Sequence, residues 1–205
     1  MQNLDREQVP FPLAGVDEAG RGCLAGPVVA AAAILPRMLD LPELNDSKKL
    51  SPVQRVNLEK AIKTNCLSWS LGLSWPREIE QLNILQATLK AMGKAISGMT
   101  MTPQLVLVDG NQVPDLPIPM YSIVHGDNLH PCISAASVLA KTFRDRLMIS
   151  LDKKYPQYGF AQHKGYFTRL HRERLELYGP CCLHRKTFKP LAVNKKEKHL
   201  CLPHI

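Results

Sequence analysis

The stretch that decides the fold is LAGVDEAGRGCLAGPVVAAAAIL, residues Leu13 to Leu35, in which two acids and an arginine stand among glycines between two apolar runs. The first run predicts a short strand ending at Asp17 and Glu18, because the glycines that follow disfavour a helix. The β-branched residues at 28–29, just after Pro27, predict a second strand. Such a segment is suited to build a functional site.

The loop between these strands offers two kinds of chemistry. Successive strand side chains point to opposite faces, so Asp17 and Glu18 can share one site only if the strand ends or bends between them, and the glycine run favours a bend. Gly20 and Gly22 let a ligand approach backbone N–H groups, while Arg21 supplies a planar donor suited to a phosphate. We therefore predict acids for a metal and amides for a substrate within one turn of each other.

Two other interpretations of this loop stay open at this point. It is also compatible with a tight turn that merely carries charges. Gly20, Gly22 and Gly26 spell G-x-G-x-x-x-G after a strand, which resembles a dinucleotide fingerprint. The two acids before the loop would repel a pyrophosphate, and the residues after it favour a strand over a phosphate-capping helix, so the sequence disfavours this interpretation.

Size and charge narrow the class of protein. The chain has 205 residues, which suits one compact domain, and its 26 lysines and arginines against 18 acids give a net charge of +8. This charge predicts a polyanionic partner such as nucleic acid, with an anionic membrane surface as the other candidate. The longest apolar run, residues 28–35, is too short to span a bilayer, so we expect a cytoplasmic protein without a membrane partner. From size we expect a monomer.

The six cysteines show no C-x-x-C spacing, which predicts free thiols in a reducing compartment. Cys181 and His184 stand at a ligand-like spacing. No second half of a zinc site faces them, so the sequence disfavours zinc.

The rest of the chain alternates helical and extended patterns. We predict helices from about Pro52, over 76–96 and over 133–151, and strands over 66–75, 104–108 and 120–124. The last two strands deliver Asp109 and Asp127, each beside a glycine. Because ligands in open α/β sheets gather outside the carboxyl ends of the strands, these acids are expected to join Asp17 and Glu18.

Basic and aromatic residues alternate beyond Tyr155. They are Tyr158, Phe160, His163, Lys164, Tyr166, Phe167, Arg169, His171, Arg172 and Arg174. Such residues are expected to contact phosphates and bases, and the alternative is a helical flap that packs on the core. We predict a catalytic domain over 1–188 with a basic helical extension over 155–188, followed by a mobile tail over 189–205.

Four carboxylates in one crevice oppose ionisation unless a cation neutralises them. Oxygen ligands without a cysteine or histidine set select Mg²⁺ or Mn²⁺. Two such ions would activate a water and steady the leaving oxygen of a phosphodiester. The sequence therefore predicts hydrolysis of a nucleic acid backbone, with Asp17, Glu18, Asp109 and Asp127 as catalytic metal ligands.

Several separate blocks occur in an order that resembles the bacterial ribonuclease HII (type 2 ribonuclease H) family. They are DEAGRG at 17–22, LNDSKKLS at 44–51, LVDGN at 107–111, GD at 126–127, ISAASVLAK at 133–141 and YPQYGFAQHKGY at 155–166. The likeness covers about residues 15–188. Cys23, Cys132 and Phe167 depart from the family pattern, and the first is expected to loosen the loop that holds Arg21.

The resemblance implies an α/β fold of the ribonuclease H type, a mixed five-stranded sheet flanked by helices with a C-terminal helical extension. It also implies a metal-dependent endonuclease that cuts the RNA strand of RNA–DNA hybrids and incises at single ribonucleotides in duplex DNA. The expected products carry 5′-phosphate and 3′-hydroxyl ends, and the expected roles are ribonucleotide and RNA primer removal in replication and repair. Gly20, Arg21, Gly22 and Tyr166 match the family's ribose-reading residues, and Lys48 is a further candidate substrate contact.

Two other functions remain compatible with the residues alone. One is a nuclease of related fold that cuts DNA without needing a ribose. The other is a non-catalytic nucleic-acid-binding domain in which the acids only cap turns.

Overall fold

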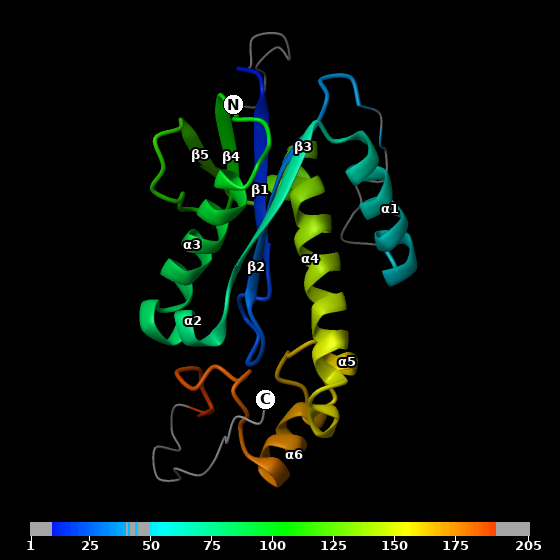
Figure 1. The fold of residues 1–205 in the computed structure, drawn as a ribbon, viewed down its shortest axis with the longest axis vertical. Helices are drawn as coiled ribbons and strands as arrows, with labels where there is room; N and C mark the ends of the chain where they lie inside the picture. Colours follow the sequence, from blue (N-terminus) through cyan, green and yellow to red (C-terminus); the bar gives the residue numbers. More distant parts are fainter. Residues whose placement is uncertain (1–9, 40, 42–43, 45–49, 192–205) are drawn as a thin grey trace.

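The computed structural model describes residues 10–39, 41, 44 and 50–191. Its centre is a mixed five-stranded sheet with strand order β3-β2-β1-β4-β5 (Figure 1). The strands are β1 (Leu13–Ala19), β2 (Val28–Ile34), β3 (Ser68–Ser74), β4 (Leu105–Asp109) and β5 (Met120–Ile123). The predicted fold class is confirmed.

The strand directions explain where the predicted acids lie. β1, β2 and β3 pair antiparallel, whereas β1, β4 and β5 pair parallel. The carboxyl ends of the three parallel strands therefore lie at the same end of the sheet. Val16 of β1 stands opposite Val108 of β4, which puts Asp17 and Asp109 at the same level on neighbouring strands.

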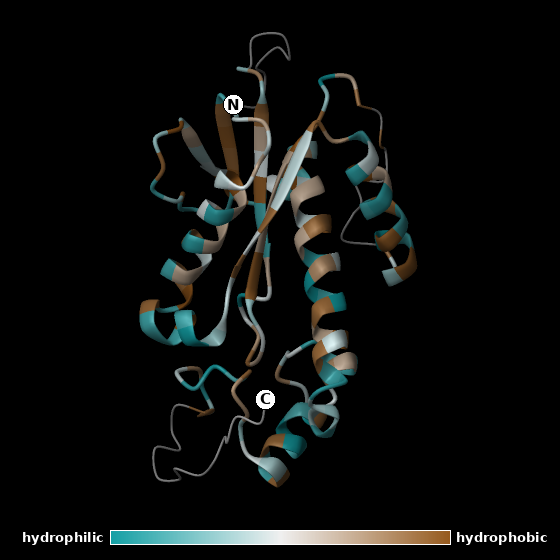
Figure 2. Cartoon of the chain, viewed as in Figure 1, coloured by the Kyte–Doolittle hydropathy of each residue, from teal (hydrophilic) through white to brown (hydrophobic). Residues whose placement is uncertain are grey.

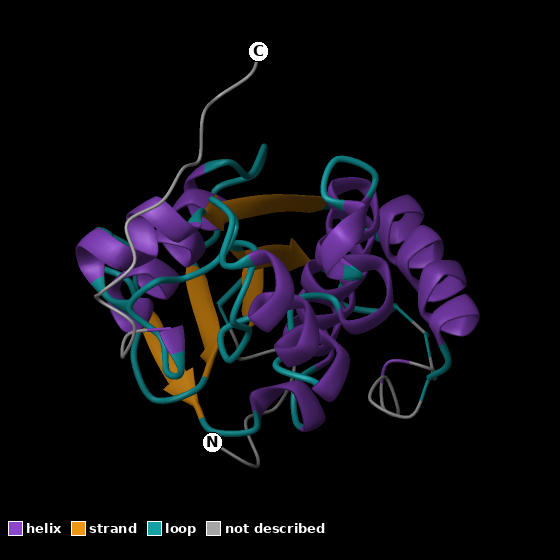
Figure 3. Cartoon of the chain, turned by 90° about the horizontal axis from the view of Figure 1, so that it is seen from below, coloured by secondary structure: helices purple, strands orange, loops and turns teal. Residues whose placement is uncertain are grey.

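Helices cover both faces of the sheet (Figure 3). They are α1 (Pro52–Asn65), α2 (Pro76–Leu82), α3 (Ile84–Ser97), α4 (Pro131–Asp152), α5 (Phe160–His163) and α6 (Arg169–Tyr178). Side chains of α1 and α4 form one hydrophobic core with the sheet, and those of α2 and α3 form a second core on the other face. In the hydropathy colouring β1, β2 and β4 are mostly brown, whereas the helices alternate between brown and teal residues (Figure 2).

The start of α4 lies very close to β1. A Cβ added to Gly15 would stand 2.2 Å from the carbonyl carbon of Cys132, so only glycine fits there. The small residues Ser134 and Ala135 of α4 are buried where the helix packs on the sheet. This close packing brings Ser137 of α4 into hydrogen-bonding contact with Asp17.

The prediction of one helix over 76–96 is wrong, because the segment forms two helices that meet at Asn83. This residue has a left-handed φ of 69°. Its side chain accepts hydrogen bonds from the N–H groups of Leu85 and Gln86, at 2.9 and 3.1 Å, and so caps α3. Asparagine tolerates this conformation and is a favoured N-cap, so a local capping interaction interrupts an otherwise continuous apolar pattern.

The C-terminal extension lies at the end of the sheet where β1 finishes (Figure 1). Two short turns, η2 (Gly126–Asn128) and η3 (Pro156–Tyr158), precede α4 and α5. A third apolar core joins the extension to Ala25 and Met148. Within the described residues, no helix combines the length and apolar character needed to cross a bilayer. The predicted mobile tail lies outside the described residues from position 192 onward and stays a prediction.

Candidate active site

Asp17 and Glu18 do not share one face of the sheet. β1 continues through both residues to Ala19, which pairs with Val29, so the predicted bend between the two acids is absent. Asp17 lies on the α4 side, where Ser137 reaches it. Glu18 lies on the α3 side, in a pocket that also contains Thr88 and Asp109. A regular strand pairing on β2 overrides the local tendency of the glycines to bend the chain.

Asp109 links the two sides electrostatically. Burial and the negative charges of Glu18 and Asp109 together raise the pKa of Asp17 to about 8, against the opposing hydrogen bond from Ser137. Burial also raises the pKa of Glu18, and Asp109 adds to this effect while Arg21 opposes it. The three acids therefore form one coupled group.

The other predicted acid, Asp127, follows the last parallel strand. It lies in the η2 turn and is 7% exposed. The N–H of the adjacent Gly126 donates a hydrogen bond of 2.7 Å to a carboxylate oxygen of Asp109. Through this bond the turn that carries Asp127 is held against the end of β4.

The donor set suits a hard divalent cation. A bound Mg²⁺ or Mn²⁺ would neutralise carboxylates placed so that the charges of Glu18 and Asp109 raise the pKa of Asp17, and among the described residues no thiol or imidazole acts on Asp17 or Glu18. However, in the part of the chain that the structure describes, no three His, Cys, Asp or Glu side chains converge closely enough to hold a metal together. The carboxylates thus fit the metal in their chemistry and lie more widely spaced than a complete set of ligands.

Two buried arginines hold the glycine loop after β1. Arg185 donates hydrogen bonds to the carbonyls of Gly20, Arg21 and Gly26, at 2.7 to 3.0 Å. Arg144 donates to the carbonyls of Ala25 and Pro27, each at 3.0 Å, and to that of Lys164 at 2.9 Å. The loop that Cys23 was expected to loosen is therefore fixed from beneath, and Cys23 itself is buried.

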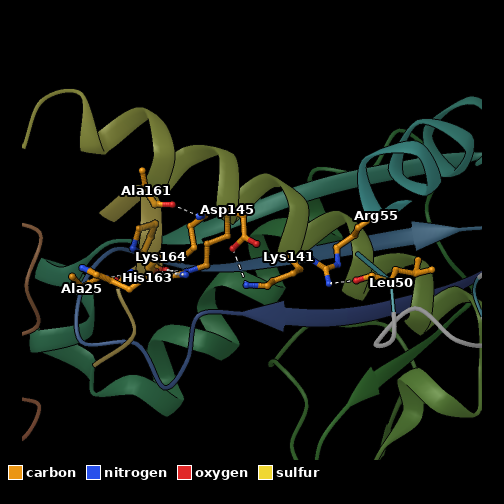
Figure 4. Close-up of polar contacts among 11 residues, drawn as sticks. Ala25, Leu50, Arg55, Lys141, Asp145, Ala161, His163 and Lys164 are labelled. Atoms are coloured by element: carbon orange, nitrogen blue, oxygen red, sulfur yellow. Dashed lines mark hydrogen bonds and ion pairs between the residues drawn. The ribbon is translucent and has the colours of Figure 1, made fainter. Parts of the chain in front are cut away.

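Tyr166 lies beside this loop, as the resemblance implied. The carbonyl of Gly165 accepts hydrogen bonds from the N–H groups of Leu24 and Ala25, at 2.9 and 3.3 Å. The Tyr166 side chain, 44% exposed, is in hydrogen-bonding contact with Cys23. The ammonium of Lys141 lies 5.4 Å from the centre of the Tyr166 ring. The same ammonium pairs with Asp145 at 2.8 Å along α4 (Figure 4).

Arg21 stands next to the acids at the end of β1. Its guanidinium lies 3.6 Å from the Glu18 carboxylate and its side chain is 46% exposed, so it faces the solvent above the acids. Lys48, the remaining predicted substrate contact, lies outside the described residues. The structure therefore brings together Asp17, Glu18, Asp109, the Gly20–Gly22 loop and Tyr166 at the end of β1.

Sequence reasoning missed the structural roles of Arg144, Arg185 and Lys141. The first had a detectable signal, since Ala136, Ala140, Arg144 and Met148 recur every four residues and are all buried. The signal was missed because a buried arginine is rare, so a pattern of apolar residues alone does not mark this position. Nothing comparable marks Arg185, which lies in an irregular segment.

The basic and aromatic set of the extension is divided between core and surface. Tyr158, Phe160, His163 and His171 are buried, so the prediction that they contact nucleic acid is wrong. Their rings pack on one another, with Tyr158 stacked on Phe160 in the third core and His163 stacked on His171 beside it. Phe167, Arg169 and Arg172 remain exposed and line a shared hollow with Thr168.

Comparisons with known proteins agree with this arrangement. The family model described as Ribonuclease HII matches residues 14–191. Ribonuclease HII of Nitratidesulfovibrio vulgaris is 48% identical over 197 residues, covering 91% of this chain and 90% of that protein. The crystal structure of ribonuclease H2 from Pyrococcus horikoshii OT3 is 26% identical with a TM-score of 0.75, covering 88% of this chain and 95% of that one.

A more distant structure shares the fold alone. Bst-RNase HIII in complex with Mn²⁺ is 15% identical with a TM-score of 0.66, covering 94% of this chain and 73% of that one. The family match and the close relative exclude the non-catalytic alternative. The chain belongs to the ribonuclease HII family and is a nuclease of the ribonuclease H type, with RNA–DNA hybrids as its class of substrate.

Proposed function

We propose that this enzyme incises duplex DNA at single embedded ribonucleotides, in addition to cutting the RNA strand of hybrids. The observation that carries this proposal is the contact between the coupled acids at the end of β1 and a loop with free amides beside Tyr166. Such a site can act on a phosphodiester and sense the neighbouring ribose at once. The expected products carry 5′-phosphate and 3′-hydroxyl ends.

Asp17, Glu18, Asp109 and Asp127 would hold Mg²⁺ or Mn²⁺. A divalent cation supplies an activated water and charge stabilisation at the leaving oxygen when it is bound. The chain's own contribution is the buried Asp17 beside Glu18 and Asp109, because burial and these two neighbouring charges raise the pKa of Asp17 to about 8. Deprotonation of Asp17 is thereby coupled to the arrival of positive charge.

The Gly20–Gly22 loop and Tyr166 supply recognition of the ribose. Among the described residues, the N–H groups of Arg21 and Gly22 have no hydrogen-bond partner, whereas the N–H groups of residues 23–26 all have one. A 2′-hydroxyl can accept from such amides and donate to an oxygen, and it is the group that separates RNA from DNA. Free donors in a rigid loop therefore suit a single ribose.

The exposed part of the extension suits the duplex backbone. Arg169 and Arg172 stand beside Phe167 in the same hollow. Arginines at such a surface pair with phosphates, and the net charge of +8 favours approach to a polyanion. We expect these contacts to position the duplex without reading its sequence.

One assay tests the proposal. Three labelled duplexes of identical sequence are compared: all DNA, DNA with one ribonucleotide, and an RNA–DNA hybrid, each with Mg²⁺, Mn²⁺ or EDTA. We expect metal-dependent cuts in the hybrid and at the one ribonucleotide, and none in the DNA duplex. Equal cutting of all three would favour the DNA nuclease alternative, and cutting of the hybrid alone would remove single-ribonucleotide recognition. A role in ribonucleotide and primer removal in the cytoplasm follows from this activity as an expectation.

A further inference from the structure

One short segment, Cys181–Arg185, lies against both halves of the proposed ribose-reading site. Its backbone pairs with the chain that follows the glycine loop, where Ala25 and His184 form an antiparallel bridge. The N–H of Gly26 donates to the carbonyl of Leu183 at 2.8 Å, and the N–H of Arg185 donates to the carbonyl of Leu24 at 2.9 Å. The segment is therefore fixed in register with the loop.

The side chain of Arg185 sets the direction of the loop amides. The residue is completely buried, and among the described residues no carboxylate pairs with it. Its guanidinium instead binds the carbonyls of Gly20, Arg21 and Gly26. When these carbonyls face the protein interior, the peptide planes turn the N–H groups of Arg21 and Gly22 the other way, toward the solvent.

The neighbouring side chain, His184, reaches Tyr166 through a second histidine. The N–H of Cys181 donates to Nδ1 of His184 at 3.0 Å, so this nitrogen carries no proton in a neutral ring. Nε2 of His184 lies 3.0 Å from Nε2 of His171, and it must be the donor. Nδ1 of His171 lies 2.9 Å from the carbonyl oxygen of Tyr166, which can only accept. The hydrogen bonds at both ends therefore agree on one arrangement, in which His184 is protonated on Nε2 and His171 is protonated on Nδ1.

The third histidine of the cluster supports this arrangement. Nδ1 of His163 accepts from the N–H of Gly165 at 3.1 Å, and its Nε2 donates to the carbonyl of Tyr158 at 2.9 Å. The His163 and His171 rings stack with centroids 4.2 Å apart. Every ring nitrogen of His163, His171 and His184 is therefore used while all three are neutral, and a proton added to any of them would oppose a donor already in place.

We propose that Arg185 and His184 are positioning residues for ribose recognition, the first through the Gly20–Gly22 loop and the second through His171 and the backbone of Tyr166. The inference rests on the proposed function. A hybrid offers a 2′-hydroxyl at every step, so a displaced reading site still finds one, whereas a duplex with one ribonucleotide offers a single correct placement. Loss of positioning should therefore slow cleavage of the one-ribonucleotide duplex more than cleavage of the hybrid.

The test compares kcat/KM on the one-ribonucleotide duplex with kcat/KM on the hybrid, for full-length variants. Arg185→Lys keeps the charge but loses the planar fork, and His184→Phe keeps a ring but loses both hydrogen bonds. We expect the ratio to fall at least about tenfold in each, with partial recovery in His184→Gln, which offers one acceptor and one donor. Arg146→Lys is the control, because the Arg146 guanidinium pairs with Glu59 of α1 and, among the described residues, bonds neither the Gly20–Gly22 loop nor the Tyr166 segment.

The outcomes separate the two proposals. If the wild-type enzyme ignores a single ribonucleotide, the proposed function fails, whatever the variants do. If the wild type cuts there and the variants lose both substrates equally, or Arg146→Lys shifts the ratio as much, the positioning role fails. Nitrogen NMR of the wild type supplies a readout independent of activity: we expect His184 to carry its proton on Nε2 and His171 on Nδ1, and the opposite tautomers would overturn the relay.

Discussion

The molecule buries titratable groups in two places, the acids at the end of β1 and the histidines of the C-terminal extension, and treats them in opposite ways. Each imidazole nitrogen of His163, His171 and His184 has a partner, so the rings stay neutral and burial lowers the pKa of His171 to about 4 and of His184 to about 3. Asp17 and Asp109 have few donors and, among the described residues, no ion-pair partner.

The difference separates a structural cluster from a functional one. Buried groups that satisfy one another stabilise a local fold and need nothing further. Buried like charges without a counter-ion keep an unfavourable arrangement that only a ligand can relieve. We therefore expect the acids to form the reactive centre and the histidines to support the proposed ribose-reading loop.

The largest expected effect is that of Asp17→Asn. We expect cleavage to fall by about 10³-fold or more, because the proposed metal ligand and its charge are lost. At the same time the metal-free protein should become more stable at pH 8, since burial raises the pKa of Asp17 from 3.8 to about 8. Between pH 3.8 and 8 the folded wild type holds a proton on Asp17 that the unfolded chain has released. The stability that the protonated Asp17 contributes to the wild type is therefore complete below pH 3.8 and is lost as the pH rises toward 8.

Urea unfolding of both proteins in EDTA at pH 6 and 8, beside a cleavage assay, checks this prediction. A circular dichroism spectrum confirms that the variant is folded. An inactive variant that is also less stable than the wild type at pH 8 would contradict the view that the buried Asp17 carboxylate destabilises the metal-free protein.

More of the acidic site than of the C-terminal extension could be predicted from the sequence. The parallel strands and their terminal acids follow from apolar runs that stop at Asp17 and Asp109, because strand ends and their carboxylates are local features. The face that each acid occupies depends on pairing between β1 and β2, which no local pattern records. The break at Asn83 was missed for a related reason, since one capping side chain outweighs a periodic stripe.

The extension was the harder region. Its histidines and aromatic residues have the composition of a nucleic-acid surface, and only the tertiary contacts show that His163 and His171 are interior. Arg185 was missed because a buried arginine satisfied by backbone carbonyls has the same one-letter pattern as a surface arginine. Sequence therefore indicates which chemistry is present more readily than which side of the molecule presents it.

The next largest effect concerns the loop that joins the two regions. Gly20 has a φ of +89°, and an added Cβ would stand 1.9 Å from Nε of Arg144. We expect Gly20→Ala to lower the free energy of unfolding by about 2 kcal/mol or more. Gly22→Ala is the matched control, because a Cβ there meets nothing within 4 Å, and it should change stability by less than about 0.5 kcal/mol. Chemical denaturation measures both, and equal losses would contradict the contact with Arg144.

A smaller effect should appear in the pH dependence of stability. His171 and His184 have lowered pKa values in the folded chain, so below pH 6.5 the unfolded chain binds more protons and stability falls as the pH drops toward 4. In the wild type Asp17 acts in the opposite sense over this range. We therefore expect Asp17→Asn to lose stability more steeply than the wild type between pH 6.5 and 4.5, by ~1 kcal/mol per pH unit. Parallel curves of the free energy of unfolding against pH for the two proteins would show that Asp17 does not oppose the histidines over this range.

The smallest expected effect separates the exposed charges of the extension from its buried ones. The Arg169 side chain is 87% exposed and pairs with Glu173 at 2.7 Å within α6, an interaction worth little to stability. Arg169→Gln should leave the unfolding midpoint nearly unchanged, weaken duplex binding and reduce the salt dependence of log K by ~1, because one phosphate contact is lost. Lys60→Gln, an equally simple change on an exposed position of α1, should alter neither. Binding measured by fluorescence anisotropy over a series of salt concentrations decides the matter. An unchanged slope for Arg169→Gln would mean that the surface of α6 does not meet the duplex and that the extension serves only to support the ribose-reading loop.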